Sequence, residues 1–241
     1  MQKTDTQFTE HLGELRKRLI ATILFFLLAF ITSFLFVTDI YQFLVRDLDG
    51  QLALLGPGDI LSIYMLLAGV CAIALSIPFA AYHIWKFVKP ALTTDEQKLT
   101  LGFIPGLFFL FLVGIAFGYF VLFPIVLTFL TSLAGEEFQM FFTAQKYFTF
   151  LLHLTLPFGI LFEMPAVIMF LTKLGILHPD QLIKGRKVAY FLLVITSVLI
   201  TPPDFISDIL VIFPLLLLYE ASITLSKLMA RKSSLHTTLS N

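Results

Sequence analysis

The sequence predicts an all-α integral membrane protein with six transmembrane helices and both termini in the cytoplasm. The helices are expected to form a kinked, concave bundle with a short, shallow hairpin of helices 5 and 6. Hydrophobic residues make up 58 % of the 241 residues and charged residues only 13 %, about half the roughly 25 % of an average soluble domain. The apolar residues form separate runs of membrane-spanning length. Lys and Arg gather in alternate loops, which is typical of a membrane protein with one fixed orientation.

The composition also excludes several classes of protein. The mean hydropathy of +0.93 excludes a disordered chain and leaves too few polar groups to cover a soluble globule. The formal net charge of zero argues against a basic nucleic-acid binder, so no nucleic-acid partner is expected. The single cysteine, Cys71, excludes a disulfide within the chain and a metal site built from several cysteines.

The chain is predicted to form one transmembrane domain over residues 1–241. An amphipathic helix over about residues 5–18 comes first and is expected to lie on the membrane surface. Its apolar residues recur at helical spacing, at Phe8, Leu12, Leu15 and Leu19. Six apolar spans follow, and a cytoplasmic tail over residues 229–241 ends the chain. The spans cover residues 19–37, 60–84, 99–123, 147–171, 188–200 and 205–228.

The first four spans contain 19–25 residues each, enough to cross a hydrocarbon core about 30 Å thick. Each proline within them is expected to bend its helix, so the bundle should be curved. These prolines are Pro78, Pro105, Pro157 and Pro165, together with Pro124 directly after the third span.

The last two spans are predicted to form a short hairpin. The fifth span, residues 188–200, reaches only about 20 Å, and Pro202 and Pro203 prevent one helix from running through both spans. Thr201 suits a turn, and Asp204 is expected to cap the next helix at the outer tip of the hairpin. Helices this short would thin the bilayer locally.

The positive charges predict the orientation. Fourteen of the 16 Lys and Arg residues lie in the N-terminal segment, in the loops after the second and fourth spans, or at the end of the sixth span and in the tail. Only Arg46 and Lys146 remain for the other loops. Because cytoplasmic segments hold most of the Lys and Arg, both termini are predicted to be cytoplasmic.

The sequence contains none of the common catalytic motifs, such as GxSxG, HExxH or a glycine-rich phosphate loop. The string Gly56-Pro57-Gly58-Asp59 matches the GxGD pattern of intramembrane aspartyl proteases. It precedes a span rather than lying within one, so a turn with Asp59 as a cap is favoured. No catalytic residue, cofactor or metal ligand is predicted.

Glu163 is the clearest ionisable residue inside a predicted span. A charge near the bilayer centre costs about 2.5–3.5 kcal/mol on insertion scales and therefore suggests a function. Glu163 is either a protonated carboxyl bonded to a neighbouring helix or to backbone freed by Pro165, or a polar docking point for another helix or a substrate. The docking point is favoured, because no Lys or Arg lies deep inside a span as a partner, Lys227 being at the cytoplasmic end of the sixth. His153 is expected to be structural, and Asp208 and Glu220 to be solvated or capping residues near span ends.

Two acidic residues on the cytoplasmic side, Glu14 and Glu96, also stand out. Their neighbours in the sequence favour a structural role for each. Glu14 lies four residues before Arg18, a pairing worth about 0.3–0.5 kcal/mol, and Glu96 follows Thr93 at the spacing of a capping box.

Taken together, five strings resemble those of the TatC family, the multispanning subunit of the twin-arginine (Tat) protein translocase. They occur in order over nearly the whole chain, and their combination on a six-span topology makes the resemblance specific. They are His11-Leu12-x-Glu14-Leu15-Arg16-x-Arg18, Phe87-x-x-Pro90-Ala91-Leu92-x-x-x-Glu96, Phe158-Gly159-x-x-Phe162-Glu163-x-Pro165, Thr201-Pro202-Pro203-Asp204, and Pro214 with Tyr219-Glu220. Three residues depart from the family pattern: Asp47, Lys89 and Asp208.

The resemblance implies a receptor for signal peptides with two consecutive arginines, located in a bacterial-type cytoplasmic membrane. It implies assembly with small single-span partners of the TatA type, and of the TatB type where one exists, and a homo-oligomer within the complex. Export of folded proteins would be driven by the proton-motive force, without a cofactor.

The resemblance also implies the site residues. Glu14 and Glu96 would receive the two arginines, since an arginine fork prefers a bidentate carboxylate that Lys cannot match. The same cytoplasmic patch would include Arg16, Phe87, Pro90 and Leu92. A second, intramembrane site that meets the signal peptide or a partner helix would contain Glu163, Phe162 and Pro165. Asp204 would lie at the outer hairpin tip.

Two other interpretations remain open. A proton- or ion-coupled secondary transporter could use Glu163 as its ion site, because such transporters use discontinuous helices and midplane acids. Against it, no inverted repeat is detectable, and a fifth span of 13 residues would make a poor gate. An intramembrane enzyme comes third, since no nucleophile–base pair is evident.

Overall fold

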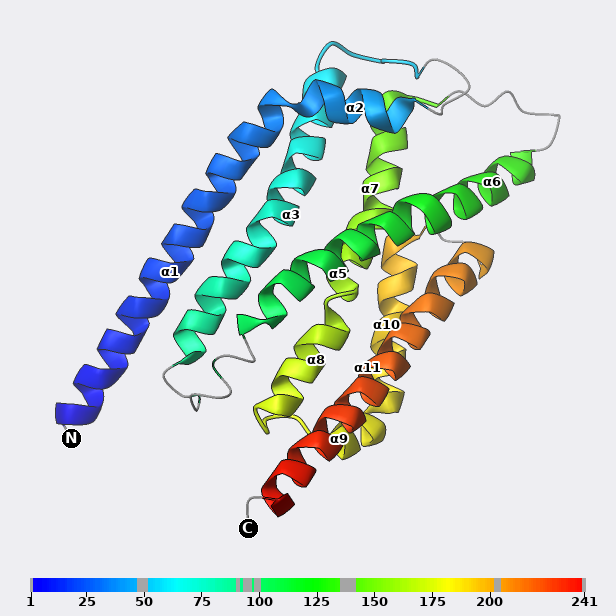
Figure 1. The fold of residues 1–241 in the computed structure, drawn as a ribbon. Coiled ribbons are helices and arrows are strands. Elements are labelled where there is room, and N and C mark those ends of the chain that lie inside the picture. Colours follow the sequence, from blue (N-terminus) through cyan, green and yellow to red (C-terminus); the bar gives the residue numbers. More distant parts are fainter. Residues whose placement is uncertain are drawn as a thin grey trace. The chain divides into compact units, whose positions relative to one another are not determined.

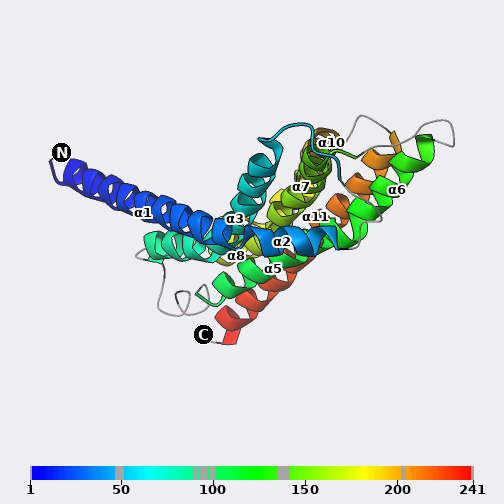
Figure 2. The ribbon, with the colours of Figure 1, turned by 90° about the horizontal axis from the view of Figure 1, so that it is seen from above.

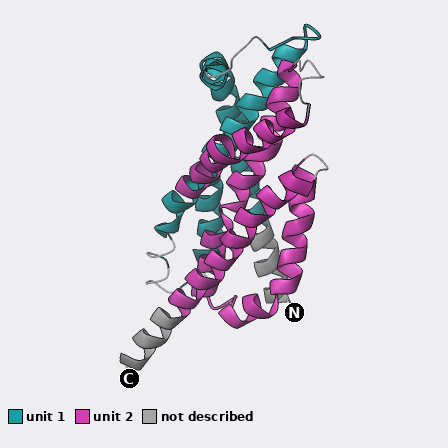
Figure 3. Cartoon of the chain, turned by 90° about the vertical axis from the view of Figure 1, so that its right-hand side faces the viewer, with its two compact units in different colours: residues 1–108 teal, residues 109–241 magenta. Residues whose placement is uncertain are grey.

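The computed structural model is all-helical over the residues that it describes, namely 2–46, 52–89, 92, 97, 101–134, 142–201 and 205–239, with side chains described except at 2–12, 134 and 231–239. The predicted all-α membrane class is confirmed, because five helices in this part of the chain are long and apolar enough to cross a membrane. The six-span count, the orientation of the termini and the single domain over 1–241 stay predictions. The chain divides into two compact units, Met1–Phe108 and Phe109–Asn241 (Figure 3).

The first unit begins with one uninterrupted helix, α1 (Gln2–Leu35). This helix covers both the predicted amphipathic segment, 5–18, and most of the predicted first span. Residues 2–35 contain no proline, and a lone glycine at Gly13 does not break a helix. The expected boundary near residue 18 is therefore not a break in the backbone.

Helix α3 (Asp59–Val88) runs side by side with α1 (Figure 1). Phe25 of α1 stacks on Phe79 of α3, with ring centroids 4.2 Å apart. Both helices also bury small residues, namely Ala29, Ser33, Ala68 and Ala72. Small residues let membrane helices approach closely, which matters because lipid provides no hydrophobic drive for their association.

The segment between α1 and α3 contains a short helix, α2 (Val37–Val45), in a region expected to be an outer loop. It lies against α3 (Figure 2), where Tyr41 and Tyr64 meet edge to face at 6.0 Å. The turn before α3 is held by Asp59, whose Oδ2 accepts hydrogen bonds from the main-chain N–H groups of Leu55 at 2.9 Å and Gly56 at 3.0 Å. This geometry agrees with the interpretation of the GxGD string as a turn. The prediction of Asp59 as the cap is wrong, because Asp59 is the first residue of α3 and Gly58 is the N-cap.

The third predicted span, 99–123, corresponds to α5 (Phe103–Phe117), a π-helical turn η2 (Gly118–Leu122) and α6 (Phe123–Ala134), which together extend well past the expected end. The boundary between the two units falls within α5. The π-turn directly precedes Pro124, whose missing N–H interrupts the regular hydrogen-bond ladder.

Three glycines bring α5 and η2 into close contact with the next helix, α7 (Ala144–Leu161). A Cβ atom at Gly114 would lie 2.6 Å from the carbonyl oxygen of Phe158, and one at Gly118 would lie 2.8 Å from the Cα of Thr155. A Cβ at Gly159 would lie 2.8 Å from the Phe111 ring. Gly114 and Gly118 form the small-xxx-small pattern that allows such contact between membrane helices.

The fourth predicted span, 147–171, consists of two helices, α7 and α8 (Met164–Lys173). They are separated by a turn at Phe162 and Glu163. Pro165 lies in the first turn of α8 and is buried. It has no N–H for the carbonyl of the preceding turn, so one regular helix cannot continue through it.

The last part of the second unit contains α9 (Pro179–Lys184), α10 (Arg186–Ile200) and α11 (Phe205–Leu239). Helix α11 packs against α8, α9 and α10. Helix α10 has 15 residues and therefore reaches only about 22 Å, so it is short for a core about 30 Å thick. The predicted sixth span, 205–228, continues as one helix into the predicted tail.

Candidate functional site

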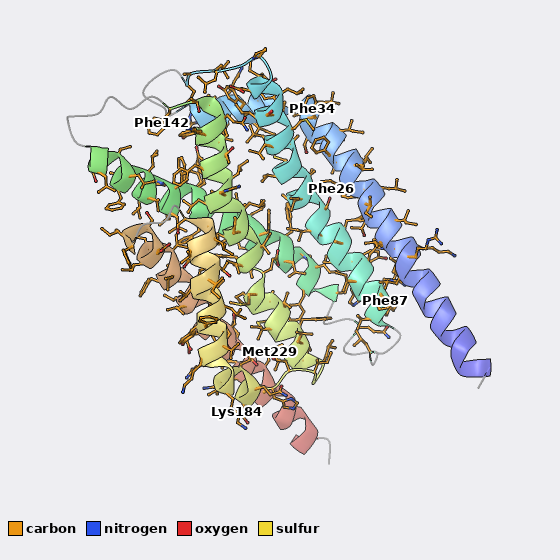
Figure 4. All side chains as sticks on the ribbon, turned by 180° about the vertical axis from the view of Figure 1, so that it is seen from behind. Phe26, Phe34, Phe87, Phe142, Lys184 and Met229 are labelled. Carbon is orange, nitrogen blue, oxygen red and sulfur yellow. The ribbon has the colours of Figure 1, made fainter. Side chains whose placement is uncertain are left out.

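Two predicted site residues of the first unit, Glu14 on α1 and Phe87 on α3, are joined by a third residue, Arg18. One guanidinium nitrogen of Arg18 donates to Glu14 Oε1, and the other donates to the main-chain oxygen of His83 at 3.0 Å. The guanidinium carbon lies 6.0 Å from the centroid of the Phe87 ring. Figure 4 labels Phe87 at the C-terminal end of α3.

Arg18 and Glu14 differ in how far they are exposed. The side chain of Arg18 is only 11 % exposed, whereas that of Glu14 is 44 % exposed. The side chain of Arg18 is therefore mostly buried where it joins the two helices, whereas nearly half of the Glu14 side chain faces solvent. The local pairing of Glu14 with Arg18 was apparent from the sequence, but the contacts of Arg18 with α3 were not.

Of the other residues predicted for the cytoplasmic patch, two are described by the structure and two are not. Arg16 is exposed and Leu92 is half-buried, and the N–H of Leu92 donates to the carbonyl of Lys89 at 3.1 Å. Pro90 and Glu96 lie outside the described residues. Whether the two acids meet therefore stays a prediction.

Lys89, one of the departures from the family pattern, has a contact of its own. Its ammonium lies 5.3 Å from the centroid of the Trp85 ring, a cation–π distance worth about 0.5–1 kcal/mol at an exposed site. The ammonium of Lys89 therefore lies against an aromatic ring of α3.

In the second unit, Glu163 occupies the turn between α7 and α8. Both of its carboxylate oxygens are buried, and neither has a hydrogen-bond partner among the described residues. Burying a polar group without a partner is unfavourable, and burying an unpaired charge is far more so. Neither structural explanation of this residue, a bond to a neighbouring helix or to freed backbone, is present in the described part of the chain.

Aromatic contacts and a main-chain hydrogen bond surround the turn at Glu163. The Phe162 ring lies 5.6 Å from that of Phe117 and 6.5 Å from that of Phe158. The main-chain N–H of Glu163 donates to the carbonyl of Ile160 at 3.1 Å. Phe162 and Pro165, both predicted with Glu163, thus anchor the turn on either side of the acid.

A polar cluster that was not expected from the sequence connects α10 with α11. Arg186 donates to Glu220 at 2.7 Å, and the Tyr190 hydroxyl donates to the other carboxylate oxygen of Glu220. Tyr219 packs edge to face on Tyr190 and donates to the carbonyl of Leu182 at 2.9 Å. Glu220 is therefore a paired residue and more than a solvated group near a helix end.

At the other end of these two helices, the hydroxyl of Thr201 donates to Asp208 in the first turn of α11. This bond ties the end of α10 to the start of α11. Asp204, predicted as the cap at the hairpin tip, lies outside the described residues.

The described side chains contain no group of three His, Cys, Asp or Glu residues arranged to hold a metal ion. Each of the two candidate sites instead contains one described carboxylate. That of Glu14 is bound by the guanidinium of Arg18, and that of Glu163 is buried without a hydrogen-bond partner among the described residues.

Comparisons with known proteins agree with this arrangement. The family model described as Sec-independent protein translocase protein (TatC) matches residues 10–214. The Sec-independent protein translocase protein TatCd of Bacillus subtilis (strain 168) is 62 % identical over 232 residues, covering 96 % of each chain. TatCy of the same organism is 42 % identical over 237 residues, covering 97 % of this chain and 93 % of that one. A crystal structure of a twin-arginine translocase receptor, TatC, superposes with a TM-score of 0.79 at 33 % identity, covering 91 % of this chain and 99 % of the other.

Proposed function

This chain belongs to the TatC family of Sec-independent protein translocase proteins, and we propose that it is the receptor that binds the twin-arginine signal peptides of folded cargo proteins. The family acts in protein transport across a membrane and is not an enzyme family. The chain is accordingly a multispanning membrane protein of the Tat translocase. The solved relative with 33 % identity is named a receptor, which supports the finer proposal.

One observation carries the peptide-binding proposal: the carboxylate of Glu14 already binds a guanidinium, that of Arg18. A hydrogen bond to a charged group contributes about 1.5–3 kcal/mol, and the planar fork of arginine fits a carboxylate better than the ammonium of lysine. Because 44 % of the Glu14 side chain is exposed, an arginine of the peptide would reach this side chain from solvent. Glu96 is proposed as the second carboxylate, with Arg16, Phe87, Pro90 and Leu92 around the pair.

The proposed role of Glu163 is to dock a partner helix within the membrane. Its two buried oxygens, which have no partner in the described part of the chain, are acceptors that a polar group on a single-span subunit of the TatA or TatB type would satisfy. Such intramembrane acids are usually functional because they are costly to bury. Assembly with these subunits, in more than one copy of this chain, would form the export path that the proton-motive force drives.

The proposed membrane is the bacterial cytoplasmic membrane, with both termini in the cytoplasm and Asp204 at the outer hairpin tip. The 15 residues of α10 support local thinning of the bilayer, because a helix of about 22 Å does not match the usual hydrocarbon thickness. The secondary-transporter alternative rests on Glu163 alone. The two Bacillus subtilis relatives described above are translocase proteins, which favours the receptor.

Binding of a signal peptide to the purified full chain in detergent tests this proposal. The peptide with Arg-Arg should bind more tightly than the same peptide with Lys-Lys. Glu14→Ala and Glu96→Ala should each weaken binding of the Arg-Arg peptide by about 1.5–3 kcal/mol and abolish the preference for Arg-Arg over Lys-Lys. Asp39→Asn, an exposed acid on α2, is the matched control and should change neither affinity. Undiminished Arg-Arg preference in the double variant would refute the acidic pair.

A further inference from the structure

A polar stripe runs along one face of α7. Gln145, Lys146, Thr149 and His153 follow one another at helical spacing, although α7 belongs to a candidate membrane span. Polar residues within a membrane span usually face a protein interior or a polar cavity rather than lipid. This stripe is not part of the peptide or partner sites discussed above.

The stripe lines a cavity between α7 and the end of α10. The cavity has a volume of about 370 Å³, and Thr201 adds a fifth polar side chain while Leu199 and Ile200 form its apolar wall. This volume falls within the range of about 300–1,000 Å³ that is typical of small-molecule sites. The amide oxygen of Gln145 is buried without a hydrogen-bond partner among the described residues, so this wall has an unused acceptor.

A second cavity of about 310 Å³ adjoins the first, because Lys146 and Phe150 line both. Apart from Lys146 and two threonines, its lining is apolar or aromatic: Leu127, Leu130, Phe142, Tyr147 and Phe150. A cationic side chain therefore stands between a polar cavity and a largely apolar one, both within the second unit.

Both cavities lie at one end of this unit. Helix α7 begins at Ala144 and α10 ends at Ile200, so the polar cavity is bounded by two helix ends. Figure 4 labels Phe142 at this end and Lys184 of α9 at the opposite end. Ends of membrane-spanning helices lie near the lipid headgroups, where lysine side chains extend toward the interface.

We propose that these adjoining cavities hold one anionic glycerophospholipid, with its headgroup in the polar cavity and acyl chain carbons in the apolar one. The ammonium of Lys146, the imidazole N–H of His153 and the hydroxyl of Thr149 are donors for phosphate oxygens. A hydroxyl on the headgroup would donate to the unpartnered oxygen of Gln145. Asp208 accepts a hydrogen bond from the hydroxyl of Thr201 and belongs to the junction of α10 and α11.

Lipid retention by the purified full chain tests this site. The protein is exchanged into detergent containing phosphatidylglycerol, phosphatidylcholine or diacylglycerol, and bound lipid is counted by native mass spectrometry. We expect one retained phosphatidylglycerol per chain, with weaker retention of phosphatidylcholine and none of diacylglycerol. Equal retention of phosphatidylglycerol and phosphatidylcholine would overturn the proposal, as would saturable binding of inorganic phosphate that does not require a lipid.

Variants assign the retained lipid to this cavity. Lys146→Gln should weaken phosphatidylglycerol binding by about tenfold or more, as expected for loss of a charge-assisted hydrogen bond, and Lys146→Arg should largely preserve it. Lys187→Gln, which removes an exposed cation at the start of α10, is the matched control and should bind normally. An equal loss in Lys187→Gln and Lys146→Gln would overturn a specific site.

A second variant tests the cavity without removing a charge. Leu199→Trp would fill the polar cavity from a position that is 78 % exposed in the free chain, so folding should be preserved. It should displace the retained lipid while leaving the thermal unfolding temperature in lipid-free detergent unchanged. Full lipid retention in a folded Leu199→Trp protein would overturn the proposal.

Discussion

Arg18 on α1 donates a hydrogen bond of 3.0 Å to the main-chain carbonyl oxygen of His83 on α3, although the two residues are 65 positions apart in the sequence. The same guanidinium binds Glu14 and lies over the ring of Phe87. One buried side chain therefore fixes the spacing of two residues that are proposed to contact the signal peptide.

Arg18→Lys should lower both the stability of the chain and its affinity for an Arg-Arg signal peptide. The lysine ammonium keeps the charge but cannot hold Glu14 and the carbonyl of His83 in the same fork geometry. Loss of one charged hydrogen bond should cost about 1.5–3 kcal/mol. Thermal unfolding in detergent and peptide titration measure the two effects. Lys17→Gln, at the exposed neighbouring position, should leave the unfolding temperature unchanged. Wild-type values for both measurements in Arg18→Lys would contradict the proposal that Arg18 holds α1 and α3 together.

Glu163→Ala should impair assembly rather than folding or peptide recognition. The side-chain oxygens of Glu163 make no hydrogen bond among the described residues, so their removal breaks no hydrogen bond within that part of the chain. Co-purification of single-span partners should fall, while the Arg-Arg preference should persist. Glu163→Gln retains a hydrogen-bonding group, so more of the single-span partner should co-purify with it than with Glu163→Ala. Normal co-purification and export with Glu163→Ala would refute the docking role.

Gly114→Ala should destabilise the second unit. The added methyl group would lie 2.6 Å from the carbonyl oxygen of Phe158, and such overpacking typically costs about 1–3 kcal/mol or more. Gly106→Ala on the same helix is the matched control, because a Cβ there meets no atom within 4 Å and alanine favours a helix by about 1 kcal/mol. Thermal unfolding of the two variants should therefore shift in opposite directions. A Gly114→Ala protein as stable as Gly106→Ala would contradict a close contact between α5 and α7 at Gly114.

Glu220→Gln and Arg186→Gln should show coupled effects on stability. Their side chains are 40 % and 39 % exposed, so the pair should contribute only about 0.5–1 kcal/mol. A double-mutant cycle by chemical or thermal unfolding measures this coupling without assigning it to either residue. Lys187→Gln combined with Glu220→Gln should give no coupling. Strict additivity of Arg186→Gln and Glu220→Gln would mean that the bridge between α10 and α11 does not stabilise the chain.

The helical elements were predicted well where the signal is local. Apolar runs of sufficient length located the five long helices, and Pro165 explained why the fourth predicted span is broken into α7 and α8. The short helices α2 and α9 were missed, because nine and six residues carry too little periodicity to separate a helix from a loop.

The pairings of polar residues were predicted poorly. Glu220 was expected to be a solvated or capping residue, yet its partners are Arg186 and Tyr190, 34 and 30 positions away. Spacing along one helix predicts contacts only over three or four residues. The pair of Glu14 and Arg18 was within that range, whereas the bond from Arg18 to α3 was not.

By itself, the sequence determined the all-α membrane class, the family and the identity of the acids that are proposed to act. These properties depend on composition, on apolar run length and on motifs that are local in the chain. Only the tertiary structure decided that Arg18 joins Glu14 to α3, that the oxygens of Glu163 lack partners among the described residues, and that Lys146 stands between two cavities. Helix crossings bring together residues of distant helices, and close approach at glycines such as Gly114 sets these crossings, so no spacing along the chain encodes them directly.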